Sequence, residues 1–198
     1  MAQEVMTLNA AAREAGSKGM ARQVRRDGMI PGVVYGNGTE GVCVQVAPRE
    51  LKTVLKTEYG FNRVFQLDVE GVGARQCMLR EWQFDSVRRE MTHCDFLVVS
   101  DDQYVTIHVP VEPTGKSAGV AMGGRLDIVS RTVKVRCKVK DIPAKVEHDV
   151  TSLNIGESAY IDEMTAPEGC EFVFSHRYPV IRIARKRGAK VATAEATK

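Results

Sequence analysis

The sequence predicts a mainly β protein with two domains. Runs in which apolar and polar residues alternate, the period of a half-buried strand, recur along most of the chain. Glycine, proline and aspartate separate these runs, which is typical of turns between strands. The 198 residues are enough for one large or two small cores. Helical spacing is clear in two segments of the N-terminal half, so short helices should accompany the strands (an α+β arrangement).

The first expected helix is short and strongly basic. Its basic side chains fall within about a third of the helical circumference, and small apolar residues occupy the opposite side. Gly28 fits the end of this helix, and Pro31 prevents its continuation. The basic face consists of Lys18, Arg22, Arg25 and Arg26, and the anchoring face consists of Met20, Ala21 and Val24.

A β-hairpin should follow this helix. "IPGVVYG" and "VCVQVAP" have the pattern of strands, and "GNGTEG" (36–41) joins them. This turn matches the G-x-G-x-x-G dinucleotide fingerprint, but that fingerprint has to open a helix whose N-terminus receives the pyrophosphate. Because a strand follows here, we expect the glycines to allow positive φ angles in a hairpin, and no nucleotide cofactor is predicted.

A second helix, a second hairpin and a further strand complete the N-terminal half. "PRELKTVLKTEYG" begins with a proline suited to a first helical turn and places Leu51, Val54, Leu55 and Tyr59 at helical spacing. "NRVFQLDVEG" and "GARQCMLREWQF" alternate around residues 71–73 and predict a hairpin. "MTHCDFLVVS" predicts another strand.

From Asp101 onward the pattern is almost wholly strand and turn, which predicts a second, all-β domain. "GKS" at 115–117 resembles part of a phosphate-binding P-loop, but Pro110 stands where the motif requires a glycine, so we expect only a glycine-rich loop. A polar turn at 100–103 marks the expected boundary. We therefore predict domains at 1–98 and 99–185, and a tail at 186–198 that lacks periodicity and should be disordered.

Composition and charge exclude several classes of protein. No apolar run approaches the roughly 18 residues that a membrane span needs, and the N-terminus lacks the order of a secretion signal, so we expect a cytoplasmic protein without a membrane partner. The five cysteines are scattered without a CxxC pair and are expected to be reduced thiols that hold no metal. The net charge of +3 is too small to identify a nucleic-acid binder by itself.

His93-Cys94-Asp95 raises the question of a catalytic group. Adjacent side chains of a strand point to opposite faces, so His93 and Cys94 cannot form a dyad, whereas His93 and Asp95 share a face. No second cluster of serine, lysine or histidine supports catalysis, and we predict that the protein is not an enzyme. Two alternatives stay open: a non-catalytic protein-interaction module whose strands pair with a partner, and a small hydrolase that uses His93 or a cysteine.

The basic helix leaves two interpretations open, a nucleic-acid-binding face and an ordinary solvated surface. Its arginines outnumber its lysines, and the guanidinium group binds phosphates bidentately. Arg13 precedes the helix and Tyr35 follows it, so a planar aromatic side chain can join the same surface.

Several segments, in order, resemble the CTC family of bacterial large-subunit ribosomal proteins, the long two-domain form of ribosomal protein twenty-five. They are "AREAGSKGMARQVRRDGMIPGVVYG", "WQFDSVRREMTHCDFLVV", "VPVEPTGKSAGVAMGGRL", "DIPAKVEHDVTSLNIGESAYI" and "APEG". Two features depart from the family. Phe84 and Asp85 follow Gln83 where a basic or histidine-containing stretch is common, and the tail is short and mildly basic rather than long and acidic.

The resemblance implies an N-terminal β-barrel with flanking short helices, similar to the anticodon-binding domain of glutaminyl-tRNA synthetase, followed by a C-terminal all-β domain. It implies a structural role in the large ribosomal subunit, with 5S rRNA and neighbouring large-subunit components as partners and without cofactor, metal or small-molecule substrate. In this interpretation cations neutralise phosphates, while polar groups read base edges or 2′-hydroxyls. The residues carried over to the RNA-binding surface are Arg13, Lys18, Arg22, Arg25, Tyr35, His93 and Asp95.

Overall fold

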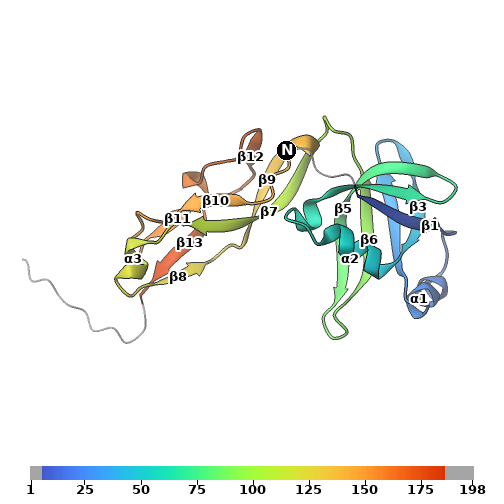
Figure 1. The fold of residues 1–198 in the computed structure, drawn as a ribbon, viewed down its shortest axis with the longest axis horizontal. Helices are drawn as coiled ribbons and strands as arrows, with labels where there is room; N and C mark the ends of the chain where they lie inside the picture. Colours follow the sequence, from blue (N-terminus) through green and yellow to red (C-terminus); the bar gives the residue numbers. More distant parts are fainter. Residues whose placement is uncertain (1–5, 186–198) are drawn as a thin grey trace, which may run out of the picture. The chain divides into compact units, whose positions relative to one another are not determined.

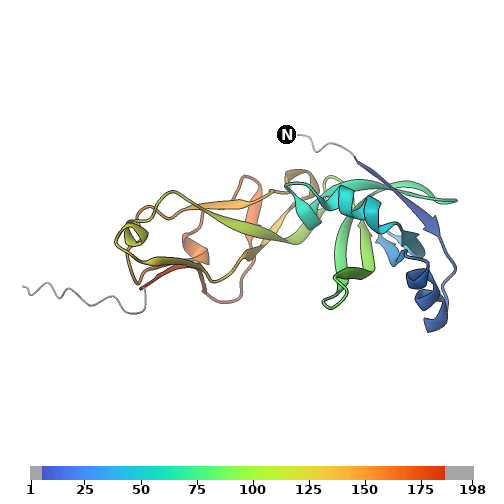
Figure 2. The same cartoon turned by 60° about the horizontal axis from the view of Figure 1, so that its bottom comes forward.

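The computed structural model describes residues 6–185, which fall into two compact units (Figures 1 and 2). Of these residues, the first unit contains 6–107 and 136–144, and the second contains 108–135 and 145–185. Both units are built mainly from strands, as the alternating pattern predicts. The predicted tail at 186–198 lies outside the described residues. No helix in residues 6–185 is long and apolar enough to cross a membrane.

Six strands of the first unit close into a barrel. The order around the barrel is β1-β3-β2-β6-β5-β4, and a parallel pairing between β1 and β4 closes it. A second parallel pairing joins β2 to β6, while the remaining neighbours are antiparallel. The strands are β1 (Thr7–Ala12), β2 (Ile30–Gly36), β3 (Thr39–Val46), β4 (Val64–Val69), β5 (Gly73–Asp85) and β6 (Glu90–Val98).

Alternate residues of these strands fill the barrel interior. Leu8, Val44, Leu67 and Phe96 are fully buried, and Phe65 packs edge-on against Phe96 with ring centroids 6.0 Å apart. Burying a side chain of this size contributes about 1.5 to 3 kcal/mol, so the period of two in the sequence is also what stabilises the barrel. The outward-facing residues of the same strands are then free to form a binding surface.

Both predicted hairpins are confirmed. β2 and β3 pair through a turn in which Gly36, Asn37 and Gly38 have φ angles of 118°, 52° and 73°, and no helix follows the glycines. The "GNGTEG" segment therefore makes a hairpin turn and not a dinucleotide loop. Gly32 has a separate role, because a Cβ atom at this position would lie 2.6 Å from the carbonyl oxygen of Cys94 in the neighbouring β6.

Two helices accompany the barrel: α1 (Lys18–Arg26) and α2 (Pro48–Leu55). The prediction that the second helix extends to Tyr59 is wrong. Lys56 leaves helical geometry with ψ at 58°, so the helix ends after it has buried Leu51 and Val54. β1 was not predicted, because its run of small residues gives a weak strand signal.

The second unit is built on a four-stranded sheet of order β10-β7-β9-β12 and a three-stranded sheet of order β11-β13-β8. The predicted glycine-rich loop contains a one-turn helix, because the buried Ser117 side chain accepts hydrogen bonds from Gly119 N and Val120 N. The further elements are β7 (Tyr104–Thr114), α3 (Ala118–Ala121), β8 (Arg125–Ile128), β9 (Thr132–Lys138), β10 (Val146–Asp149), β11 (Ser158–Tyr160), β12 (Cys170–Phe172), β13 (Pro179–Ala184) and the 3-10 turns Gly60–Asn62, Val139–Asp141 and Ile161–Glu163.

Candidate nucleic-acid interface

The outer face of the barrel brings Tyr35, His93 and Asp95 together. β2 and β6 run parallel, with Val33 beside Asp95 and Tyr35 beside Leu97. The prediction that His93 and Asp95 share a face is confirmed, because His93 Nδ1 lies 2.8 Å from Asp95 Oδ1. Their side chains are 26% and 28% exposed, so the pair is held against the sheet but stays accessible from outside. One imidazole nitrogen and one carboxylate oxygen remain available for a ligand.

Tyr35 is held in its protonated form by its surroundings. Burial is the main cause that raises the pKa of its hydroxyl, and the negative charge of Asp95 raises it further, while Arg80 opposes the shift. A phenol in this state is a hydrogen-bond donor and acceptor at neutral pH. Tyr35 therefore offers a neutral hydrogen-bond donor and acceptor beside the Asp95 carboxylate.

Arg13 lies on the same line across the strands as Asp95, with Val33 and Cys43 between them. Its backbone N–H donates to Cys43 O at 2.9 Å, and its Nε donates to Val44 O at 3.2 Å. Cys43 pairs with Val33, which in turn lies beside Asp95. Arg13 and Asp95 are thus three strand spacings apart, roughly 14 Å along the sheet.

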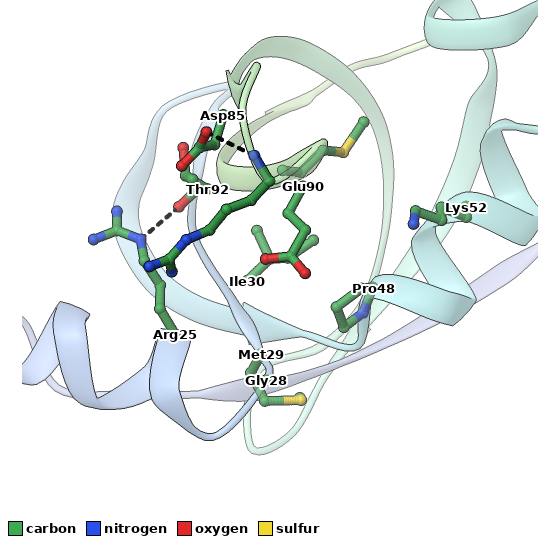
Figure 3. Close-up of a pocket in the computed structure, with 11 residues that line it drawn as sticks. Arg25, Gly28, Met29, Ile30, Pro48, Lys52, Asp85, Glu90 and Thr92 are labelled. Atoms are coloured by element: carbon green, nitrogen blue, oxygen red, sulfur yellow. Dashed lines mark hydrogen bonds between the residues drawn. The ribbon is translucent and has the colours of Figure 1, made fainter.

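A hydrogen bond from Arg25 joins the basic helix α1 to β6. Arg25 Nε donates a hydrogen bond of 2.9 Å to the carbonyl oxygen of Thr92, which is the residue before His93 (Figure 3). None of the nine residues of α1 is buried, and a helix of this length is marginal in isolation. The helix ends at Arg26, and Gly28, two residues later, turns the chain away with a φ angle of 76°. The Arg25 contact therefore fixes the position of the helix relative to the His93–Asp95 pair.

Lys18 and Arg22 are exposed and share the face of α1 that carries Arg25, because they lie seven and three residues before it. Within residues 6–185 neither has a recorded contact with His93 or Asp95, so the structure links them to that pair only through Arg25. Of the anchoring residues, Ala21 and Val24 are half-buried, whereas Met20 is 44% exposed.

A small cavity of about 190 Å³ lies between the end of α1, the start of α2 and the tip of the β5–β6 hairpin. Figure 3 shows Arg25 on one side and Lys52 on the other, with Glu90 between them. Asp85 belongs to the hairpin turn, where its carboxylate accepts hydrogen bonds from Arg88 N and Val87 N that lower its pKa. The residue at which the sequence departs from the family pattern is therefore structural.

Arg80 is a surface residue that the sequence analysis missed. It occupies the irregularity between Leu79 and Glu81 in the pairing of β5 with β6, and Glu81 is the residue opposite Asp95. Its Nη1 donates to Thr106 O at 2.8 Å. No sequence signal marks Arg80, because its place beside Asp95 depends on a local shift of register.

A hydrolase that uses a cysteine requires a reactive thiolate, and the surroundings of Cys77 and Cys94 disfavour one. Burial raises the pKa of both Cys77 and Cys94 to about 12, although Cys94 lies between His93 and Asp95 in the chain. Cys94 is fully buried in the barrel core, on the face opposite to its two neighbours. In residues 6–185 no three His, Cys, Asp or Glu side chains gather as a metal site would require.

The difference in burial predicts that the cysteine thiols of the folded protein react at clearly different rates. At pH 8 we expect a chromogenic disulfide reagent to modify Cys43 and Cys170, which are half-buried, well before the buried Cys77, Cys94 and Cys137. Unfolding in denaturant should make all five thiols react at one rate. Rapid modification of Cys94 in the native state would contradict the structure and restore the hydrolase alternative.

Comparisons with known proteins agree over both units. The model of the ribosomal L25p family matches residues 8–96, and the model of the C-terminal domain of ribosomal protein TL5 matches residues 104–187. Large ribosomal subunit protein bL25 of Anaeromyxobacter dehalogenans strain 2CP-C is 40% identical over 185 residues, which cover 93% of this chain and 77% of the relative. The bL25 protein of Geobacter sulfurreducens is 34% identical over 193 residues, 97% of this chain and 100% of the relative.

Proposed function

The chain belongs to the ribosomal L25p family, and on that premise we propose that its N-terminal domain binds 5S rRNA within the large ribosomal subunit. Membership of the family gives the chain a structural, non-enzymatic role and a place on cytoplasmic ribosomes. The RNA-binding domain in this proposal is 1–98, and the proposed C-terminal domain is 99–185, of which 99–107 and 136–144 lie in the first compact unit. Other large-subunit components are its further partners.

The observation that carries the proposal is the layout of the barrel surface. Polar groups that can read an RNA groove lie at Tyr35, His93 and Asp95, and cations flank them on two sides, at Arg13 and on α1. The minor groove of an RNA helix is wide and shallow and displays 2′-hydroxyls and base edges between two phosphate backbones. A polar centre with basic flanks matches that arrangement of charge.

Each group has a defined task in this proposal. Lys18, Arg22 and Arg25 neutralise phosphates on one side of the groove, and Arg13 does so on the other. Asp95 accepts a hydrogen bond from a base amino group or a 2′-hydroxyl, since His93 occupies only one of its oxygens. A carboxylate close to phosphates costs affinity unless it has such a donor, so Asp95 supplies discrimination among RNAs.

Titration of 5S rRNA with the full chain over a range of salt concentrations tests this proposal. We expect tight, salt-dependent binding that prefers 5S rRNA to an unrelated duplex of equal length. Arg22→Ala should reduce the slope of log K against log salt by about 0.7 to 0.9, the loss of one phosphate contact. Arg49→Ala, which removes an exposed arginine from α2, is the matched control and should change the slope less.

The outcome separates RNA binding from the protein-interaction alternative. A wild-type chain that binds 5S rRNA and the unrelated duplex equally would refute the proposal. Binding without salt dependence would instead favour the interaction module, because counterion release accompanies every phosphate contact.

A further inference from the structure

A second basic cluster lies in the first unit at the start of β7 and the end of β9, outside the residues already assigned. The Tyr104 ring is 57% exposed, and two cations lie over it. Arg136 Cζ is 5.3 Å and Lys138 Nζ is 5.7 Å from the ring centroid. Val139 N donates to Gln103 O at 3.1 Å, which places the two strands side by side at this point.

Within residues 6–185 the two cations of this cluster lack acidic partners of the kind that Lys140 and Lys145 have. Lys140 lies 3.8 Å from Asp102, and Lys145 lies 2.7 Å from Glu112 and 2.8 Å from Glu147. In the described part of the chain neither Arg136 nor Lys138 forms an ion pair, and both cations contact the Tyr104 ring. Two neighbouring positive charges without a counter-charge attract a ligand that carries closely spaced negative charges.

Arg80 connects this cluster to the candidate RNA surface. It lies in the β5 irregularity beside Glu81, the residue opposite Asp95, and its guanidinium donates to Thr106 O at 2.8 Å. Thr106 follows Tyr104 by two residues, so both side chains are on the exposed side of β7. Arg80 therefore lies between Asp95 and the Tyr104 cluster, and all of these residues belong to the first unit.

We propose that Arg136 and Lys138, arranged around Tyr104, form a second phosphate-contact site for the same 5S rRNA molecule that the barrel face binds, and that Arg80 links this site to the barrel face. This inference rests on the proposed function and extends it. Arg136 and Lys138 contact phosphates, and the Tyr104 ring keeps the two cations in place by cation–π attraction. The site adds affinity and orients the RNA but does not read its sequence.

The test is the salt dependence of 5S rRNA binding by the full chain. Arg136→Gln combined with Lys138→Gln should reduce the slope of log K against log salt by about 1.4 to 1.8, the loss of two phosphate contacts. The matched control is Lys140→Gln combined with Lys145→Gln, which removes the same charge from two lysines that already have acidic partners. We expect the control to change the slope by less than half as much.

Substitutions at Tyr104 give a second, independent measurement. Tyr104→Phe retains the ring and should bind like the wild type, whereas Tyr104→Leu should weaken binding about two- to fivefold at low salt.

The possible failures are distinguishable. Equal slopes for the Arg136/Lys138 double variant and its control would overturn the second site, provided that the wild type prefers 5S rRNA and Arg22→Ala lowers the slope. If the wild type shows no such preference, the proposed function fails, and the second site fails with it.

Discussion

Phe96→Ala should lower the free energy of unfolding of the barrel by about 3 to 5 kcal/mol, the usual cost of truncating a buried phenylalanine. Phe96 is fully buried, packs edge-on against Phe65 and lies in β6 between Asp95 and Leu97. Removal of its ring leaves a cavity at the point where β2 and β6 pair, because Val34 is the residue beside it in β2. The same strand pair carries Tyr35 and Asp95, so this loss should also weaken the candidate RNA surface.

The fluorescence of the single tryptophan, Trp82, allows the barrel to be followed separately from the second unit. Trp82 belongs to β5 and stacks on Phe61 with ring centroids 4.0 Å apart and an interplanar angle of 9°. Urea titration of the full chain should show an earlier midpoint for Phe96→Ala with an unchanged slope. Phe84→Ala is the matched control, because Phe84 is 53% exposed in the same hairpin and its loss should cost less than about 1 kcal/mol. Equal costs for both variants would contradict the assigned core.

The sequence predicts the parts of the fold that depend on local pattern. Alternation in "HCDF" is typical of a strand and predicts the shared face of His93 and Asp95. The positive φ angles near Gly36 and Gly71 follow from turn chemistry, and the proline of α2 marks its first turn. Each of these features is settled by residues close together in the chain.

The features that the sequence did not reveal depend on pairing between distant segments. Closure of the barrel needs β1 beside β4, and Tyr35 meets Asp95 only because β2 pairs with β6. The Arg25 bond to Thr92 joins residues 67 positions apart. Arg80 reaches the same surface through an irregularity in β5. Alternation shows which face a residue occupies but does not show which strand lies beside it.

Asp95→Ala should weaken binding to 5S rRNA by about 1 to 3 kcal/mol, or roughly 5- to 150-fold, while leaving the salt dependence unchanged. The variant loses an acceptor held in place by His93 at 2.8 Å, but it loses no phosphate contact. Binding to an unrelated duplex should stay the same or become tighter, because a repulsive carboxylate is removed. Discrimination between the two RNAs should therefore fall by at least as much as the affinity for 5S rRNA.

A suitable control for Asp95→Ala is Asp68→Ala, which removes an exposed carboxylate from β4, two strands away around the barrel. The control should leave affinity and discrimination nearly unchanged. Because His93 and Asp95 are in contact, His93→Ala and the double variant should show a coupling of about 0.5 to 3 kcal/mol in 5S rRNA binding. If Asp95→Ala instead tightens binding to both RNAs equally, Asp95 is a repulsive surface charge and the discrimination has to come from Tyr35 and His93 alone.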